Sequence, residues 1–173
     1  MKSTQLTNLV LRKPTKSDGT AMWHLAQETK SLDLNSVYAY LMMSDMFSDT
    51  CAVALEEEKM VGFITGFLQP ERANTLFIWQ IGVKPGYRKR GIAKQMLLEL
   101  LKRDENRQVR FLEATVGPNN LASRELFLRL AAELKTECKI SEHFSQRLFP
   151  TSTGHEAELL FRMGPFKTKE VVE

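Results

Sequence analysis

The sequence is poor in cysteine. Its two cysteines, Cys51 and Cys138, lie far apart and outside any paired motif, so they provide neither a disulfide framework nor a zinc signature. We predict that each is a small core residue of a reduced, cytoplasmic protein rather than a nucleophile. No metal site is expected.

Long apolar runs and a strong charge of one sign are also missing. No stretch reaches the roughly 18 apolar residues of a membrane span, and residues 1–5 lead into no apolar core of the kind found in signal peptides. The net charge of +3 over 173 residues is too small to indicate nucleic acid by itself. These absences favour a cytoplasmic protein with neither a membrane nor a nucleic acid as its partner.

What is present is an ordinary globular composition. Hydrophobic residues make up 43% and charged residues 26% of a chain long enough for one domain with a full core. The sequence contains no repeat, low-complexity tract or clear linker. We therefore expect a single domain over residues 8–166, with flexible termini at 1–7 and 167–173.

Strands and helices alternate along the chain. Alternating or continuous apolar runs predict strands, and apolar residues at helical spacing predict helices. The pattern indicates one mixed layered structure of the α/β (α+β) class. The long segment 142–156 is rich in Ser, Thr, Phe and His, which is typical of a lid or binding loop. Strands are expected at 8–14, 51–56, 60–68, 75–83, 109–116, 133–141 and 157–163, and helices at 17–29, 37–43, 91–103 and from 119 onwards.

The most informative motif is a basic turn between the strand at 75–83 and the helix that follows it. The turn, residues 88–93, reads Arg-Lys-Arg-Gly-Ile-Ala. At such a turn the unpaired N–H groups of the helix, its positive dipole end and the cationic side chains converge on one anion. Gly91 allows the backbone to approach a phosphate closely, and Arg88 and Arg90 supply forked donors. A helix start with solvated cations is the simpler alternative.

The spacing Arg-x-x-Gly-x-Ala in this setting resembles the acetyl-CoA pyrophosphate loop of the GNAT superfamily of N-acetyltransferases, and the order of elements matches that family. The resemblance implies a single-domain GNAT fold: a mixed, mostly antiparallel central sheet with a splay between the fourth and fifth strands and helices on both faces. It also implies acetyl-CoA as the cosubstrate. The expected CoA contacts in this motif are Arg88, Lys89, Arg90, Gly91 and Ala93.

A second part of the family's motif opens the helix after Pro118. Asn120 matches a position that hydrogen-bonds the pantetheine amide, and Ser123 a position near the pyrophosphate or pantetheine. Phe127 stands where the family usually has the Tyr that protonates the leaving thiolate. The acid is therefore missing from its usual place, and the thiolate leaves unassisted or is protonated through water. Simple capping by Asn120 and Ser123, and core packing by Phe127, are the alternatives.

The strand at 75–83 has a further role in this family. The resemblance implies that the acyl-pantetheine arm enters the splay and pairs with the strand backbone, here at Ile81 and Val83. Trp79 and Gln80 come just before this point and are placed to face the acceptor. A tryptophan in a strand is equally often a core residue.

An amine acceptor needs carboxylates that bind its cationic groups and a base that removes a proton, because lysine-like amines have a pKa near 10.4. Such side chains are densest in the segment 155–158, His-Glu-Ala-Glu, where a strand would place Glu156 and Glu158 on one face. A solvated strand edge is the alternative. The further candidates are Asp33, Glu71 and Glu113.

Five stretches of the chain, at 11–14, 32–36, 79–83, 115–123 and 154–159, carry a closer resemblance. They look like the corresponding stretches of the L-2,4-diaminobutyrate acetyltransferases of ectoine biosynthesis. The pieces Leu-Asp-Leu-Asn-Ser and Gly-His-Glu-x-Glu are the more specific ones, and the remainder is general to the GNAT superfamily.

That resemblance implies transfer of acetyl to the 4-amino group of a small-molecule amine, diaminobutyrate, by direct attack in a ternary complex. It also suggests a homodimer and a part in the response to osmotic stress. Asp33 and Glu158 are expected to hold amino groups. Glu158 is the first choice for the base, directly or through water, and His155 is the second catalytic candidate. The other residues expected at the acceptor are Asn35, Tyr38, Trp79, Gln80 and Asn119.

Several alternatives stay open. The nearest is a GNAT enzyme that acetylates another small amine, such as a polyamine, ornithine or lysine. Acetylation of a protein N-terminus or a lysine side chain needs an open groove, which the segment 142–156 would obstruct. A non-catalytic acyl-CoA-binding module would bind acetyl-CoA without consuming it. A nucleic-acid binder is disfavoured, because the cations lie in one turn without interleaved aromatic residues.

Overall fold

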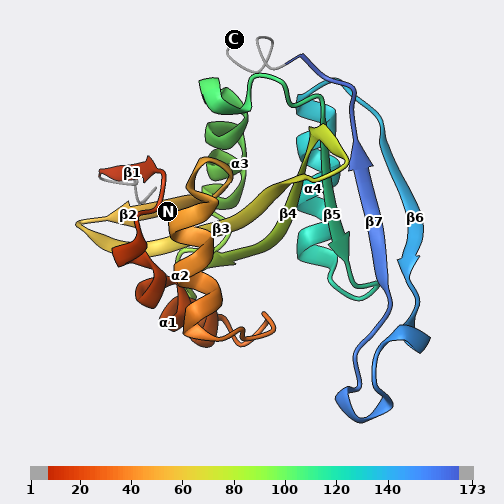
Figure 1. The fold of residues 1–173 in the computed structure, drawn as a ribbon, viewed down its shortest axis with the longest axis horizontal. Helices are drawn as coiled ribbons and strands as arrows, with labels where there is room; N and C mark the ends of the chain where they lie inside the picture. Colours follow the sequence, from red (N-terminus) through yellow and green to blue (C-terminus); the bar gives the residue numbers. More distant parts are fainter. Residues whose placement is uncertain (1–7, 168–173) are drawn as a thin grey trace, which may run out of the picture.

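A seven-stranded mixed sheet with helices on both faces organises the chain, and the computed structural model describes residues 8–167 of it (Figure 1). The fold class predicted from the sequence is confirmed. The strands are β1 (Leu9–Arg12), β2 (Ala52–Glu56), β3 (Lys59–Gln69), β4 (Arg72–Val83), β5 (Phe111–Val116), β6 (Cys138–Phe144) and β7 (Glu158–Met163). The α-helices are α1 (Gly19–Thr29), α2 (Val37–Met46), α3 (Ile92–Lys102) and α4 (Leu121–Glu133).

The strand order is β1-β2-β3-β4-β5-β7-β6. Neighbouring strands are antiparallel except for β4 and β5, which run parallel. The last strand in the sequence therefore lies inside the sheet, between β5 and β6. Because Val116 pairs with Leu159, this insertion brings the start of β7 beside the carboxyl end of β5.

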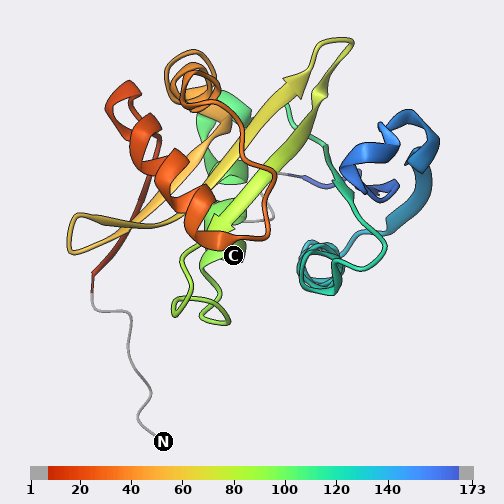
Figure 2. The same cartoon turned by 90° about the horizontal axis from the view of Figure 1, so that it is seen from below.

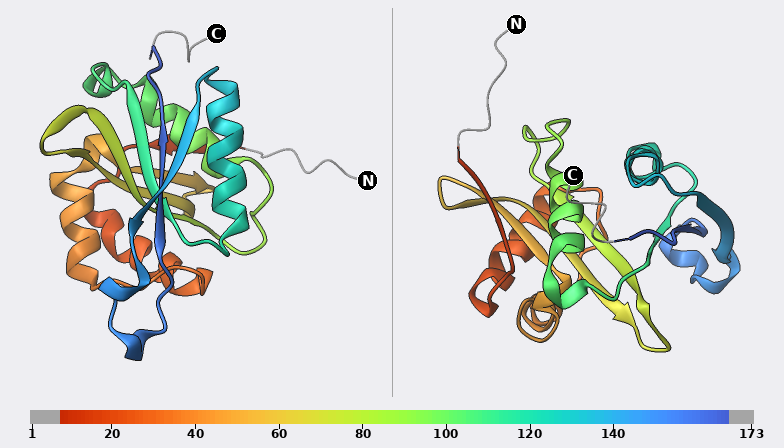
Figure 3. Two further views of the ribbon diagram at one scale, coloured as in Figure 1. Left: turned by 90° about the vertical axis from the view of Figure 1, so that its right-hand side faces the viewer. Right: turned by 90° about the horizontal axis from the view of Figure 1, so that it is seen from above.

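The helices form two layers on opposite faces of the sheet (Figures 2 and 3). Residues of α1 and α2 pack with Val53 and Phe63 in one apolar cluster, and residues of α3 and α4 form the larger cluster on the other face. The predicted stripe on α3 accounts for this packing, since its buried positions recur at spacings of three and four. They are Ile92, Met96, Leu97, Leu100 and Leu101.

β4 and β5 diverge toward their carboxyl ends, as the resemblance to the GNAT fold implied. They are joined by four residue pairs, from Thr75 with Phe111 to Ile78 with Ala114. Beyond these pairs β4 continues along β3, while β5 continues along β7. The divergence opens the sheet between a β1–β4 part and a β5–β7–β6 part (Figure 3).

A β-bulge at Trp79 changes which face the side chains of β4 occupy. Successive residues of β3 pair with Ile78 and Gln80, so Trp79 has no partner in this ladder. Ile78 before the bulge and Ile81 after it both pack with the α3–α4 layer. Strict alternation would have placed Gln80 on the same face as Ile78, but the extra residue turns it toward the α1–α2 layer instead.

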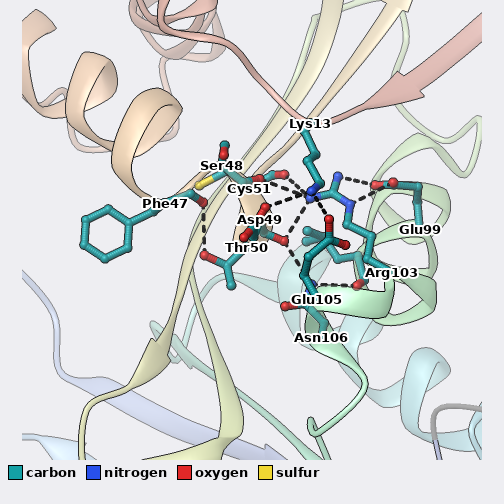
Figure 4. A network of polar contacts seen from close by, with 11 residues as sticks. Lys13, Phe47, Ser48, Asp49, Thr50, Cys51, Glu99, Arg103, Glu105 and Asn106 are labelled. Carbon is teal, nitrogen blue, oxygen red and sulfur yellow. Dashed lines mark hydrogen bonds and ion pairs between the residues drawn. The ribbon is translucent and has the colours of Figure 1, made fainter.

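A buried arginine ties the segment that follows α2 to the end of α3 (Figure 4). Arg103 is 8% exposed. Its Nη1 donates to the carbonyl oxygens of Ser48, Asp49 and Cys51 at 3.2, 3.0 and 2.7 Å, and its Nε donates to Glu99 Oε1 at 2.8 Å. One side chain thus satisfies several main-chain acceptors of a segment that has no strand partner of its own.

Several boundaries differ from those expected, among them the starts of β4 and β6. β4 begins at Arg72, because Gln69 pairs with Arg72 across a tight turn where a longer polar connection was predicted. β6 begins only at Cys138, since α4 continues to Glu133 and Lys135 then takes a left-handed φ of 52° that reverses the chain. Both differences fall in stretches rich in polar residues, where apolar periodicity does not mark the ends of elements.

The two cysteines are free, and burial raises the pKa of both thiols, that of Cys51 to about 12. Neither is an activated nucleophile. Within residues 8–167, no helix is long and apolar enough to cross a membrane, and no cluster of three potential metal ligands occurs in that range. The flexible termini predicted at 1–7 and 167–173 lie outside the described residues, apart from Lys167.

Candidate active site

A cavity of about 600 Å³ lies where β4 and β5 diverge. Its walls come from the α1–α2 loop, the bulged part of β4, the end of β5, the first turns of α4 and the β6–β7 loop. It brings Asp33 within reach of His155, although 122 positions separate them in the sequence. The expected site residues that line it are Asp33, Asn35, Trp79, Gln80, Ile81, Asn120, Ser123, Phe127, His155 and Glu158.

The basic turn lies at the N-terminus of α3. Gly91 precedes the helix with a φ of 75°, a left-handed conformation that favours glycine, and it has no side chain with which to cap the helix. Arg88 Nη2 donates to the carbonyl oxygen of Thr29 at 3.1 Å, and the Arg90 guanidinium lies 4.8 Å from the centre of the Tyr87 ring. These contacts orient two cations beside a helix N-terminus, which is an arrangement that binds phosphates. The basic turn, with Lys89 and Ala93, and also Val83, lie outside the lining of the cavity.

The start of α4 forms another wall. Asn120 caps the helix, since its Oδ1 accepts from the Ser123 backbone N–H at 3.1 Å, and both residues also line the cavity. Phe127 lies one turn further along and is 3% exposed, with its ring 6.3 Å from that of Phe161. Asn120 therefore caps the helix and Phe127 packs in the core, while both residues also line the cavity. Phe127 offers no proton donor there.

An oxygen atom that can accept a hydrogen bond lies near each ring nitrogen of His155. Nδ1 lies 2.6 Å from the carbonyl oxygen of Glu156, and Nε2 lies 3.2 Å from Asp33 Oδ2 and 3.8 Å from Glu158 Oε1. Only the imidazolium can donate from both nitrogens. The Glu156 carbonyl raises the pKa of His155 most, and the two carboxylates add to it against the opposing effect of burial. Stacking on Phe149, with centroids 4.0 Å apart, holds the ring in place.

Glu158 is the first residue of β7, and its side chain is 23% exposed. Burial has the largest influence and raises the pKa of Glu158, while a hydrogen bond from Thr115 and the charge of His155 act in the opposite direction. The net shift is upward. A carboxylate with a raised pKa is a better proton acceptor than an ordinary one, and Glu158 lies beside an imidazole whose own pKa is raised.

The neighbouring residues of β4 differ in what they offer the cavity. Trp79 is 44% exposed and lines the cavity, so it forms a wall rather than part of the core. Gln80 is 7% exposed, and its side-chain amide is bonded to Tyr40 and to the backbone of Asp33. Its polar groups are therefore engaged within the protein.

The other candidates lie outside the cavity, at its rim or on the loop that borders it. Tyr38 is 69% exposed on α2 and does not line the cavity; its neighbour Tyr40 occupies the inward side of the helix instead. Asn119 donates to the Glu156 side chain at the rim. Glu156 lines the cavity as well, but because β7 begins only at Glu158, it does so from the loop and not from the strand face that the two glutamates were expected to share.

Glu113, a further carboxylate candidate, is buried and bonded to other side chains of the protein. It is 1% exposed, and its Oε1 accepts from Arg162 Nη1 at 2.5 Å and from Arg72 Nη1 at 3.1 Å. Gln69 Nε2 also donates to it, at 3.1 Å. Two cations and an amide saturate this carboxylate, which leaves it unavailable to an acceptor. Glu71 is exposed at the turn between β3 and β4.

Several residues that line or support the cavity were not predicted from the sequence, and three of them contact the predicted site residues. Thr115 bonds Glu158, Phe149 stacks on His155, and Tyr40 bonds Gln80. A signal existed for Thr115, because strand alternation places it opposite the buried Ala114 on β5. The roles of Phe149 and Tyr40 depend on tertiary contacts between distant segments and left no local pattern.

Comparison with known proteins identifies the family. Residues 19–132 match the Acetyltransferase (GNAT) family. The chain belongs to this family. The fold, the divergent β4–β5 pair and the glycine-bearing helix start at Gly91 are thus features of a GNAT acetyltransferase.

Similar GNAT proteins extend over most of the chain. An L-2,4-diaminobutyric acid acetyltransferase of Halalkalibacterium halodurans is 49% identical over 92% of this chain and 83% of the relative. That of Virgibacillus pantothenticus is 49% identical over 89% and 96%. Among solved structures, the diaminobutyrate acetyltransferase EctA of Paenibacillus lautus, in complex with L-2,4-diaminobutyric acid and coenzyme A, is 45% identical. Its TM-score is 0.90, over 92% of this chain and 96% of that chain.

Proposed function

We propose that this GNAT protein transfers the acetyl group of acetyl-CoA to the 4-amino group of L-2,4-diaminobutyrate. The observation that carries the proposal is the placement of Asp33 and Glu158 on either side of His155, in a cavity at the β4–β5 divergence. Two carboxylates suit an acceptor with two amino groups. Relatives that are 45–49% identical over about nine-tenths of the chain are named for that acceptor.

The CoA part of the site is proposed to follow β4, α3 and α4. Arg88, Lys89 and Arg90 neutralise the pyrophosphate, and its oxygens accept from the backbone N–H groups after Gly91. Ala93 keeps the helix surface small beside them. The pantetheine arm runs into the divergence along the backbone of β4 and the wall formed by α4. Its proposed contacts there are Ile81, Val83, Asn120, Ser123 and Phe127.

In the proposed reaction the neutral 4-amine attacks the thioester carbonyl carbon, a C–N bond forms and the C–S bond breaks. Glu158 accepts the proton that the amine loses, directly or through water. The raised pKa of Glu158 favours this role. A thiol has a pKa of about 8.5, below the roughly 10.4 of an alkylamine, so the thiolate is the better leaving group and departs without an acid at Phe127.

Asp33 and Glu158 lie at different depths in the cavity, and we propose that they bind different amino groups. The Asp33 side chain is 83% exposed and that of Glu158 is 23% exposed. We assign the outer carboxylate to the 2-amino group and the inner one to the 4-amino group, which then lies nearer the divergence. His155 screens the two negative charges from each other, and Trp79 and Asn35 border the acceptor. Direct transfer needs no acyl-enzyme, in keeping with the raised thiol pKa values of both cysteines.

A thiol-release assay with acetyl-CoA and L-2,4-diaminobutyrate tests the proposed function, and NMR of the product determines which nitrogen carries the acetyl group. We expect turnover with diaminobutyrate well above that with ornithine, lysine or spermidine, and acetylation at N4. Preference for another amine would replace the acceptor assignment. Binding of acetyl-CoA without turnover of any amine would contradict an enzymatic function.

The setting of this activity is proposed on the same similarity. The product would enter ectoine synthesis in the cytoplasm under osmotic stress, and the enzyme would act as a homodimer. Exposed apolar side chains on and after β6, Ile140 and Leu148 among them, support a second copy as a partner. Light scattering coupled to size-exclusion chromatography would give a mass of about 20 kDa if the protein is a monomer instead.

A further inference from the structure

We infer that Tyr40, acting through Gln80, is a positioning residue for the amine acceptor, because together they fix the loop that carries Asp33. The inference rests on the proposed function, in which Asp33 binds an amino group. Tyr40 does not line the cavity. Its role would be exerted through one buried hydrogen-bonded chain that starts on α2, passes through β4 and ends on the α1–α2 loop.

The donors and acceptors of this hydrogen-bonded series all point in a defined direction. Gln80 Nε2 donates to the backbone carbonyl oxygen of Asp33 at 2.7 Å, and a carbonyl can only accept, so the amide orientation is fixed. Gln80 Oε1 must then face Tyr40, whose hydroxyl donates to it at 2.8 Å. Tyr40 is 1% and Gln80 7% exposed. Each polar atom of the Gln80 amide thus has one partner, and replacement by bulk water is restricted.

The bulge at Trp79 is what makes this chain possible. Without the extra residue, Gln80 would face the α3–α4 layer with Ile78. In the bulged strand its backbone N–H donates instead to Thr65 Oγ1 at 3.2 Å, and its side chain reaches between α2 and the Asp33 loop. A polar residue in the apolar part of β4 thereby acquires a complete set of partners.

Asp33 depends on this support because its own side chain is little restrained. The carboxylate is 83% exposed, and its contact across the cavity is with His155 Nε2 at 3.2 Å. The bond from Gln80 holds the main chain at that residue. If the bond is lost, the loop samples more positions and Asp33 spends less time where it meets both His155 and an ammonium group.

The kinetic test uses Gln80→Met and Tyr40→Phe. Met fills a similar volume without hydrogen bonds, and Phe removes a hydroxyl while the edge contact with Phe63, at 5.9 Å, can remain. We expect the KM for diaminobutyrate to rise about five- to tenfold in Gln80→Met and less in Tyr40→Phe. The KM for acetyl-CoA should change less than twofold. The double variant should be no worse than Gln80→Met alone, since both act through one chain.

Ser44→Ala is the matched control. Ser44 is fully buried on the same helix, and its Oγ donates to the Tyr40 carbonyl oxygen at 2.6 Å. Its loss removes another buried hydroxyl without touching the Gln80 amide. If Ser44→Ala raised the KM for diaminobutyrate as much as Tyr40→Phe, the effect would be one of general stability and the inference would be overturned.

A second readout does not depend on acetylation. The chain has three histidines, so the His155 ring can be followed by NMR after assignment with His155→Asn. We expect the pKa of His155 to fall in Gln80→Met, because Asp33 contacts the ring for less of the time. An unchanged pKa together with an unchanged acceptor KM would overturn the inference. If the unsubstituted enzyme failed to acetylate diaminobutyrate, the proposed function would fall, and this titration would still decide whether Gln80 fixes the Asp33 loop.

Discussion

Glu158 is the residue on which the proposed chemistry depends most directly. Replacing its carboxylate by an amide in Glu158→Gln keeps the shape but removes the base, so we expect kcat to fall by about 10²- to 10⁴-fold. The affinity for acetyl-CoA, measured by isothermal titration calorimetry, should be unchanged. Glu71→Gln is the control, since that side chain is exposed at the turn between β3 and β4 and does not line the cavity. A kcat within threefold of the unsubstituted enzyme would assign proton transfer to another group.

His155 should make stability depend on pH in a predictable direction. Its pKa is raised in the folded protein, by the Glu156 carbonyl first and then by Asp33. A raised pKa contributes stability that is fully present below the unfolded value of about 6.5 and is lost as pH rises through the folded value. Urea unfolding should therefore show that His155→Gln is less stable than the unsubstituted protein at about pH 5.5. The difference should shrink as the pH rises toward 9, and a difference that grew with pH would contradict the assignment.

At the scale of elements, the parallel β4–β5 pair is held at its closed end by the buried Glu113. Arg162 on β7 donates to this carboxylate at 2.5 Å and lies 3.9 Å from the centre of the Phe111 ring. Arg162→Met leaves a 1% exposed carboxylate with one main cation, which should cost about 3 kcal/mol in the free energy of unfolding. Arg72→Met removes a half-exposed partner and should cost less, about 1 kcal/mol.

Denaturant unfolding of both arginine variants distinguishes the buried Glu113–Arg162 pair from an ordinary surface ion pair. The free energy of unfolding should drop more for Arg162→Met than for Arg72→Met. If Glu113 were an acceptor-binding carboxylate instead, Glu113→Gln would raise the KM for diaminobutyrate. We expect it to change stability and leave that KM unaltered, because Glu113 lies outside the lining of the cavity.

The elements themselves could be read from the sequence, but their fine geometry could not. Periodicity located α3 and its buried stripe, because Ile92, Met96 and Leu100 recur at helical spacing. The run at 75–83 predicted a strand and gave no sign of the bulge at Trp79, since apolar residues occupy both faces of it. The direction of Gln80 followed from that single extra residue. Local pattern therefore predicted which residues form β4 and missed what one of them does.

At the scale of the whole molecule, the site forms because segments far apart in sequence meet where β4 and β5 separate. Motif similarity pointed to Asp33, His155 and Glu158 separately, while their meeting depends on the insertion of β7 between β5 and β6. That insertion also brings Glu158 close to Thr115. No local propensity encodes such a strand order, so sequence motifs alone could not show that Asp33, His155 and Glu158 meet.

Substitutions in the Arg103 network should lower stability without changing catalysis. Neither Arg103 nor the carbonyls that it binds line the active-site cavity. Arg103→Met removes a buried donor from those carbonyls, of which those of Ser48 and Asp49 keep another partner. We expect a loss of about 3 kcal/mol, equivalent to a Tm lower by roughly 10 °C in a protein of this size. Lys13→Met, which removes a half-exposed cation from the same network, should lower stability by under about 1 kcal/mol. Calorimetry measures both, and steady-state assays well below the lower Tm should give unchanged KM values for acetyl-CoA and diaminobutyrate. A raised KM in Arg103→Met, with the fold intact at the assay temperature, would mean that the segment after α2 transmits its position to the active site and that the two functions of the fold are coupled.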